Sequence, residues 1–339
     1  MPTLNFSNVK IGDVLELNFG LVPINKNSVK LTIGNVPATL TGTWNENYTK
    51  FKVASITKDS TIAMIAEAYD DPNLIVFDNL TLGSTFLFGK HQVNTETPWD
   101  IEWEIVHQTS DYQIAQTVQL IDVRMFDGEE ASNRDTYRQK YGNNNWKLSN
   151  IRQWLNSDAA AGTWYSAQHS ADAPPTDANG YNSYPTGYDD RPGFLYNFTA
   201  AQKSAMMNFD LTLKIPKVDG GGSHVVTQKV FFPTMTQMGF GANEGVSECS
   251  VFNKYDGVEN SVRIKTVHPN VVAYSKYTST HPNYGANRAW LWWLSSCYTS
   301  SDDARSVHFS GELENTIVSR DNYALAPCIV LPRTGKCSG

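Results

Sequence analysis

Residues 145–156, NWKLSNIRQWLN, contain one of two helix signals in a chain whose other segments mostly favour strands. Ser149 is a good N-cap, because its side-chain oxygen can accept a hydrogen bond from a backbone N–H of the first turn. Ile151, Trp154 and Leu155 follow at the spacing that places side chains on one face of a helix. The second signal is residues 199–202, TAAQ, which form a capping box. Two short helices within a strand-rich chain indicate the α+β class.

Strand patterns surround these helices. Residues 100–106 and 117–123 are rich in β-branched or aromatic side chains, which favour strands. Residues 290–294, WLWWL, alternate as a strand would, so about half of these rings should face a core. The three glycines at 220–222 predict the tip of a hairpin. Residues 172–192 are dense in Pro, Gly, Asn, Asp and Tyr, and they predict a long surface loop.

The residue pattern of the first part of the chain predicts a separate module. Residues 14–19, VLELNF, and 29–33, VKLTI, alternate apolar and polar side chains with a period of two, which is typical of strands with one face in water. Turn signals at short spacing favour a small antiparallel β-sandwich. Residues 61–68 fit either a buried strand or a short helix. We therefore expect a β-sandwich module over residues 1–80 for attachment or oligomerisation, and a second domain over residues 81–339.

Composition excludes several classes of protein. The chain has 339 residues, with 27 Lys and Arg against 34 Asp and Glu, for a net charge of -7. Binding to nucleic acid depends on clustered positive charge, so this balance argues against it. No apolar run approaches the ~18 residues that span a bilayer, and the N-terminus does not resemble a secretory signal. We expect neither membrane insertion nor a signal peptide.

Motifs for cofactors and catalysis are not found. No cysteine pair has the C-x-x-C spacing of zinc sites, and the seven histidines are scattered. The signatures of serine hydrolases, NTPases and dinucleotide-binding enzymes do not occur. Residues 301–303 with Glu312 offer too few oxygen ligands for calcium and fit solvated turns better. We predict no catalytic residue, no metal and no cofactor, although a carboxylate pair for glycoside hydrolysis depends on spatial position and stays open.

Aromatic residues are numerous, with 9 Trp, 16 Tyr and 15 Phe. Exposed Trp and Tyr rings suit stacking on sugars or anchoring in a protein interface. A long loop can instead bury its own tyrosines, and the two interpretations carry equal weight here. The predicted ligand-binding residues are Trp164, Tyr165, Tyr181, Tyr184 and Tyr188.

An ordered series of motifs resembles a domain of uncharacterised function found in many phage and prophage proteins. The resemblance covers about residues 82–333. Its motifs are FLFGK at 86–90, IEWEIV at 101–106, NWKLSNIRQWLN at 145–156, KVFFPT at 229–234, WWL at 292–294, VHFSG at 307–311 and APCIVL at 326–331.

The resemblance implies a C-type lectin-like fold with two short helices and long loops. It further implies a non-enzymatic virion protein of the fibre, tail-tip or decoration type, made in the host cytoplasm and located in the virion. The expected partners are other virion proteins and a host cell-surface glycan or protein. A homo-oligomer is expected, with a trimer as the form usual for fibres. The calcium-binding signatures of sugar-binding animal lectins do not occur in this chain.

Two enzymes remain as alternatives on the same fold. Formylglycine-generating oxidases bind copper through two late, closely spaced cysteines, whereas Cys328 and Cys337 here are nine residues apart. A thiolate pair without a positively charged or metal-ligand setting is more often inert. A glycan-degrading enzyme would be recognised by release of reducing ends from a host polysaccharide.

Overall fold

The computed structural model forms two compact units, Met1–Leu74 and Ile75–Gly339. The expected boundary was after residue 80. The boundary in the structure comes a few residues earlier, because Ile75, Phe77 and Leu80 are buried in the core of the second unit. The structure describes the strands of the first unit and, in the second unit, residues 75–129, 141–166, 172–277, 285–300 and 302–338.

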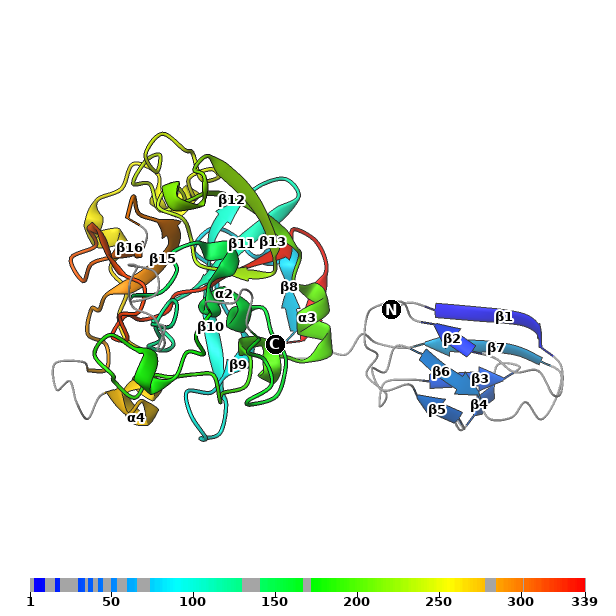
Figure 1. The fold of residues 1–339 in the computed structure, drawn as a ribbon. Coiled ribbons are helices and arrows are strands. Elements are labelled where there is room, and N and C mark those ends of the chain that lie inside the picture. Colours follow the sequence, from blue (N-terminus) through cyan, green and yellow to red (C-terminus); the bar gives the residue numbers. More distant parts are fainter. Residues whose placement is uncertain are drawn as a thin grey trace. The chain divides into compact units, whose positions relative to one another are not determined.

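The described strands of the first unit form two antiparallel sheets, in the orders β1-β7-β3-β4 and β2-β6-β5 (Figure 1). Two such sheets are the elements from which the predicted β-sandwich would be built. Of residues 61–68, which fitted either a strand or a helix, 61–65 lie in β7, and 66–68 lie outside the described residues. The bounds are β1 (Thr3–Val9), β2 (Glu16–Asn18), β3 (Lys30–Ile33), β4 (Val36–Ala38), β5 (Gly42–Trp44), β6 (Lys50–Val53) and β7 (Ser60–Ile65).

A five-stranded antiparallel sheet in the order β14-β18-β11-β10-β9 organises the second unit. Ala115 of β11 lies opposite Ile329 of β18, so the sheet joins the start of the domain to its end. The strand predicted at 100–106 is confirmed as part of β10, in which Trp103 and Ile105 are buried. The bounds are β9 (Thr85–His91), β10 (Trp99–Gln108), β11 (Tyr112–Thr117), β14 (Val230–Phe231) and β18 (Cys328–Pro332).

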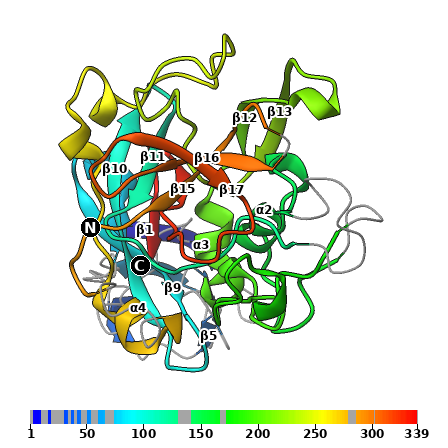
Figure 2. The ribbon, with the colours of Figure 1, turned by 60° about the vertical axis from the view of Figure 1, so that its left-hand side comes forward.

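Smaller sheets complete the unit. The predicted hairpin is confirmed, with positive φ at Gly220, Gly221 and Gly222 between β12 and β13. β15, β16 and β17 form a three-stranded sheet of their own, which is drawn in orange in Figure 2. The bounds are β8 (Leu74–Val76), β12 (Phe209–Lys214), β13 (Ser223–Gln228), β15 (Trp292–Cys297), β16 (Asp303–Val307), β17 (Leu313–Ile317) and β19 (Lys336–Ser338), with β8 paired to β19.

Both predicted helices are confirmed by their caps. Ser149 accepts a hydrogen bond from the backbone N–H of Arg152 at the start of α2 (Asn150–Leu155). Thr199 and Gln202 form the reciprocal capping box of α3 (Ala200–Ala205). A further helix, α4 (Pro269–Tyr274), was not predicted; the side chain of His268 caps it. Short helices and several antiparallel sheets place the chain in the α+β class, and no described helix has the length and apolar character to cross a membrane.

The predicted strand at 117–123 is wrong. β11 ends at Thr117, and beyond it Leu120 and Val123 make single bridges to Val267 and Ala324, which lie in different segments. Leu120, Ile121 and Val123 are buried, as apolar side chains of a strand would be. The backbone nevertheless turns, because Asp122 uses its carboxylate to accept the backbone N–H of Val123 and to pair with buried groups.

The prediction that rings at 290–294 face a core is confirmed, and more than half of them are buried. Every residue of β15 is buried, and Trp292 and Trp293 are both fully enclosed. Trp293 stacks on Tyr323 with the ring centres 4.5 Å apart, and its indole N–H donates to the Arg124 carbonyl. Both faces of this strand are covered by other segments. The side chains that alternate between its two faces are therefore all buried.

Candidate functional site

A pocket of about 720 Å³ opens beside the β15-β16-β17 sheet. Its walls come from the long loop at 172–192, from the turn before β16, and from the end of β17. The pairing of β16 with β17 brings the last two of these segments together, and the hydrogen bond from the Tyr181 backbone N–H to the Ser319 carbonyl joins the loop to them. The residues that line the pocket are Tyr141, Tyr181, Ser300, Asp302, Asp303, Asn315, Thr316, Ile317 and Arg320.

One wall of the pocket is aromatic and cationic. Tyr181 is 44% exposed, so its ring is accessible at the wall of the pocket. The guanidinium carbon of Arg320 lies 4.4 Å from the centre of the Tyr181 ring, a cation–π contact. The Tyr141 ring is 6.0 Å away from Tyr181 at an angle of 47°. Together the two rings provide apolar surface that a ligand can cover.

The other wall is polar. Asn315 on β17 donates its side-chain N–H to Oδ2 of Asp303 on β16, at 2.9 Å. The backbone N–H of Asp303 donates to Oγ of Ser300, which fixes the turn before β16. Asp302 is nearly fully buried, whereas Asp303 is half-buried and keeps part of its carboxylate at the pocket. Carboxylate, amide and hydroxyl groups of this kind bind ligand hydroxyl groups.

The loop that carries Tyr181 is anchored to the segment after β17. The Tyr181 backbone N–H donates to the Ser319 carbonyl at 2.8 Å. The buried Asp321 carboxylate accepts hydrogen bonds from the Tyr184 backbone N–H, at 2.7 Å, and from the Asn182 side chain, at 3.1 Å. Burial raises the pKa of Asp321, while these hydrogen bonds oppose the rise. The loop is therefore held by specific bonds at Tyr181 and in the three residues after it.

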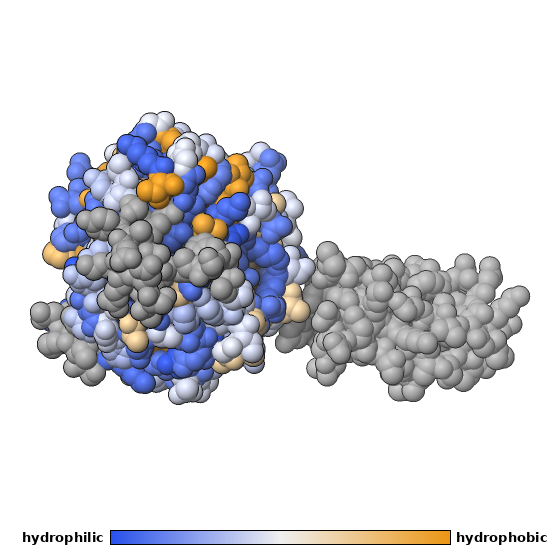
Figure 3. All heavy atoms as spheres, viewed as in Figure 1, coloured by the Kyte–Doolittle hydropathy of each residue, from blue (hydrophilic) through white to orange (hydrophobic). Residues whose placement is uncertain are grey.

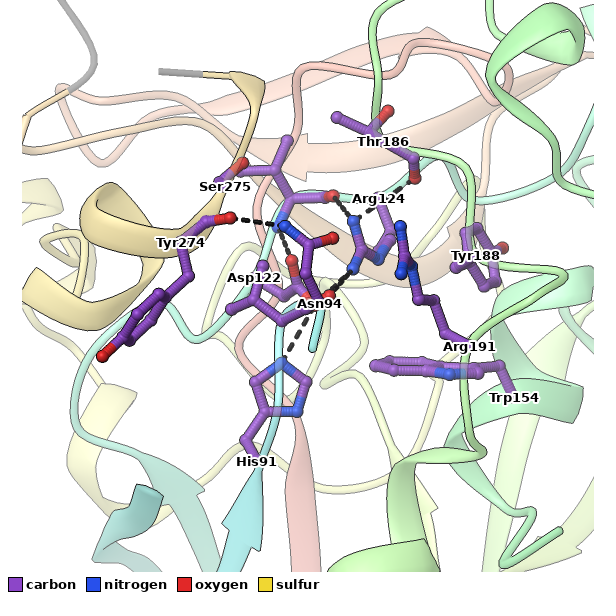
Figure 4. A network of polar contacts seen from close by, with 12 residues as sticks. His91, Asn94, Asp122, Arg124, Trp154, Thr186, Tyr188, Arg191, Tyr274 and Ser275 are labelled. Carbon is purple, nitrogen blue, oxygen red and sulfur yellow. Dashed lines mark hydrogen bonds and ion pairs between the residues drawn. The ribbon is translucent and has the colours of Figure 1, made fainter. Parts of the chain in front are cut away.

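A buried ionic network supports the same loop from below (Figure 4). His91 and Arg124 both contact Oδ2 of Asp122, at 2.9 and 3.2 Å. Arg124 also donates to the carbonyl of Thr186 in the loop, at 3.4 Å, and the Thr186 hydroxyl donates to the Asp321 carbonyl. One chain of bonds thus runs from β9 to the anchor of the loop.

This network is shielded from solvent and its role is structural. His91, Asp122 and Arg124 are each at most 2% exposed. Aromatic rings surround His91, with Trp99 and Trp154 edge-on to it at 5.7 and 6.1 Å. A ligand has no access to such a site without local unfolding. We therefore assign the network to the support of the loop and the pocket to ligand contact.

The structure separates the five predicted ligand-binding residues. The predicted exposure of Trp164 and Tyr188 is wrong, because both are buried and stack on each other with ring centres 5.4 Å apart. The Trp164 indole N–H donates to the Tyr188 carbonyl, and the Tyr188 hydroxyl donates to the Met125 carbonyl. The loop folds back on these rings, which is the alternative that the sequence left open.

The other three predicted residues differ in exposure. Tyr165 and Tyr184 are half-buried; burial raises the pKa of Tyr165, and Tyr184 packs edge-on against Tyr277 at 5.3 Å. Of the five, Tyr181 is the exposed one and the one that lines the pocket. Arg320 and Asn315, which also line the pocket, were not among the residues predicted from the sequence. The signal that could have identified them is the sequence ENTIVSR at 314–320, in which polar residues flank the β-branched pair Ile317 and Val318. The same pattern also fits an edge strand without a binding role.

Groups that would hold a metal or a redox centre were also compared with the structure. Among the described residues, no three His, Cys, Asp or Glu side chains are arranged to hold a metal ion. Glu312, considered with residues 301–303 for calcium, accepts the Ser310 hydroxyl instead. Cys328 and Cys337 are both buried, and burial raises the thiol pKa of Cys337 to about 11. Such thiols are protonated at neutral pH.

Comparison with known proteins identifies a domain but no activity. A family model described as a domain of unknown function (DUF6273) matches residues 114–333. The match covers more than half of the chain, and every residue that lines the pocket lies within it. No curated protein and no solved structure matches the chain.

Proposed function

The chain belongs to the DUF6273 family of domains of unknown function, and from this premise we propose that it is a binding protein without catalytic activity. The ligand is a hydroxylated molecule of a host surface, with a glycan as the first candidate, and it occupies the pocket beside Tyr181. The observation that carries the proposal is the exposed Tyr181 ring, which stands at the wall of an open pocket on a loop anchored by Asp321.

The chemistry of the two walls supports a saccharide. Sugar rings have apolar faces that stack on aromatic side chains, and Tyr181 and Tyr141 offer two such surfaces. Sugar hydroxyl groups need donors and acceptors in fixed positions, which Asp303, Asn315 and Ser300 supply. An anchored loop limits the entropy that is lost on binding.

The biological setting in this proposal rests on the motif resemblance. We place the protein in a phage or prophage virion, in a fibre, tail tip or decoration, with the second unit as a C-type lectin-like domain. The first unit then serves attachment to other virion proteins or oligomerisation. Several copies side by side would convert weak single-site binding into strong adhesion. Immunogold labelling of virions tests this setting; absence of label from purified particles would contradict it.

A binding assay on an array of bacterial surface polysaccharides tests the ligand. The full-length chain is compared with Tyr181→Ala and with the control Tyr196→Ala, since Tyr196 is 48% exposed but does not line the pocket. We expect Tyr181→Ala to weaken binding roughly tenfold, or about 1.4 kcal/mol, and the control to bind as the parent chain does. Equal binding by all three proteins would show that the pocket is not the ligand site.

One observation favours a glycan-degrading enzyme as the second candidate. The pocket contains two carboxylates, Asp302 and Asp303, and glycoside hydrolysis uses two. Asp302 is buried, however, and Asp303 is hydrogen-bonded to Asn315, so neither is placed as a free acid or base. Incubation of the chain with the polysaccharide it binds, followed by an assay for reducing ends, separates the two functions. Release of reducing ends that is lost in Asp303→Asn would favour the enzyme.

The other enzyme of this fold, the formylglycine-generating type, receives less support. Such an enzyme needs two cysteine thiolates at a copper site. The thiols of Cys328 and Cys337 are buried, and burial raises the pKa of both, which disfavours the thiolate.

A further inference from the structure

The guanidinium of Arg320 has more hydrogen-bond donors than the described part of the protein uses. Within the described part of the chain, no carboxylate lies at ion-pair distance from its guanidinium. Its one side-chain hydrogen bond to another described residue is a long contact of 3.5 Å from Nη1 to Oδ1 of Asn182. The guanidinium has five N–H donors, so most of them are left for other partners. Figure 3 shows mostly hydrophilic residues on the viewed face of this unit, with apolar ones in small groups.

The contact with Tyr181 prepares Arg320 for a particular kind of ligand. Its guanidinium carbon is 4.4 Å from the ring centre, a contact that restrains the long side chain against the wall of the pocket. An arginine restrained in this way loses less entropy when it binds, and its donors form a fork that matches the two oxygens of a carboxylate. A lysine at this place would provide charge without that fork.

The pocket also carries charges of opposite sign on its two walls. Arg320 follows β17, whereas Asp303 begins β16, and both line the same space. A negative group of a ligand is attracted to the Arg320 wall and repelled from the Asp303 wall. Hydroxyl groups, in contrast, can donate to the Asp303 carboxylate. The charges therefore favour one orientation for a ligand that has an acidic end and a hydroxylated end.

We infer that the ligand of this pocket is an acidic saccharide, whose carboxylate binds Arg320 while its sugar ring lies on Tyr181 and its hydroxyl groups bind Asp303 and Asn315. This inference rests on the proposed function and narrows it to one class of glycan. It assigns Arg320 as the residue that distinguishes acidic from neutral saccharides.

The test compares two ligands that differ in the carboxylate. The probes are oligogalacturonate and oligomannuronate, each also in a form whose carboxyl groups are reduced to primary alcohols. The proteins are the full-length chain, Arg320→Gln, and the control Arg305→Gln. Arg305 is a matched control because it is also half-buried and lies 4.4 Å over a tyrosine ring, that of Tyr298, without lining the pocket.

We expect the parent chain to bind at least one acidic probe roughly tenfold more tightly than its reduced form, and this preference to decrease with salt. Arg320→Gln should lose the preference yet still bind the reduced form, which also shows that the variant is folded. Arg305→Gln should keep the preference. Equal binding of acidic and reduced forms by the parent chain would overturn the inference and leave the proposed function standing. Binding of none of the probes, together with no binding on the polysaccharide array, would overturn both.

Discussion

Nε2 of His91 lies 2.9 Å from Oδ2 of Asp122, and both side chains are buried. Arg124 contacts the same carboxylate oxygen from the other side, at 3.2 Å. Arg124 in turn holds the Thr186 carbonyl of the long loop. A buried carboxylate in the central part of the domain therefore contributes to the position of a surface loop, and its removal should affect both stability and the pocket.

Asp122→Asn should lower the free energy of unfolding by about 3–5 kcal/mol, because it leaves the buried Arg124 without a counter-charge. Urea unfolding at constant pH measures the change. Asp100→Asn is the matched control, since Asp100 pairs with Lys90 where both side chains are 50% exposed. Exposed pairs contribute about 0–1 kcal/mol. Similar losses in the two variants would contradict the assigned role of Asp122.

Gly180→Ala should disturb the anchor of the loop. A Cβ at this position would lie 2.4 Å from Oδ2 of Asp321, the carboxylate that also holds Tyr184 and Asn182. We expect a loss of about 1–3 kcal/mol in stability together with weaker saccharide binding, since Tyr181 is the next residue. Gly285→Ala is the control, because its Cβ meets only the flexible side chain of Arg288, at 3.3 Å. Unchanged affinity in folded Gly180→Ala would show that the anchor does not position Tyr181.

Trp164→Phe should separate packing from ligand contact. The change removes the indole N–H that donates to the Tyr188 carbonyl and part of a buried ring, so we expect a loss of about 1–3 kcal/mol in the free energy of unfolding. Affinity for the saccharide, measured by titration calorimetry well below the melting temperature, should stay within about twofold of the parent value. Tyr181→Ala, in contrast, should weaken saccharide binding and change the free energy of unfolding little. If Trp164→Phe weakened binding as much as Tyr181→Ala, the division between these two loop residues would be wrong.

Lys265 should make stability depend on pH. Its side chain is buried, donates to the Thr117 carbonyl at 2.5 Å, and burial lowers its pKa from 10.5 to about 7. Between about pH 7 and pH 10 the unfolded chain therefore binds more protons at this residue than the folded chain does. By linkage, the contribution of Lys265 to folding becomes more favourable as the pH rises through this window.

Lys265→Met removes this titration. The melting temperature of the parent chain, relative to that of the variant, should increase from pH 7 to pH 10. Parallel pH profiles of the two proteins, recorded by calorimetry in buffers of equal ionic strength, would contradict the assignment.

Signals carried by a few neighbouring residues predicted local structure well. The Ser149 N-cap, the capping box of Thr199 and Gln202, and the glycine hairpin at 220–222 all lie where the sequence indicates. These features form through hydrogen bonds and backbone preferences within three or four residues. The strand predicted at 117–123 failed because the carboxylate of Asp122 pairs with His91 and Arg124, and the first of these is far away along the chain.

The candidate site, too, was predicted from the sequence only in part. Composition and loop pattern identified an aromatic-rich loop, and Tyr181 was among its named residues. Tyr181 and Tyr188 belong to one loop and have the same side chain, yet one is 44% exposed and the other is fully buried. The difference depends on the Met125 carbonyl and Trp164 for Tyr188, and on Ser319 and Arg320 for Tyr181. The sequence by itself determined the α+β class, the capped helices and the hairpin, because short-range bonds form them. Only the tertiary structure decided which ring reaches solvent and which charged groups surround it, because those depend on contacts between segments that are distant in the chain.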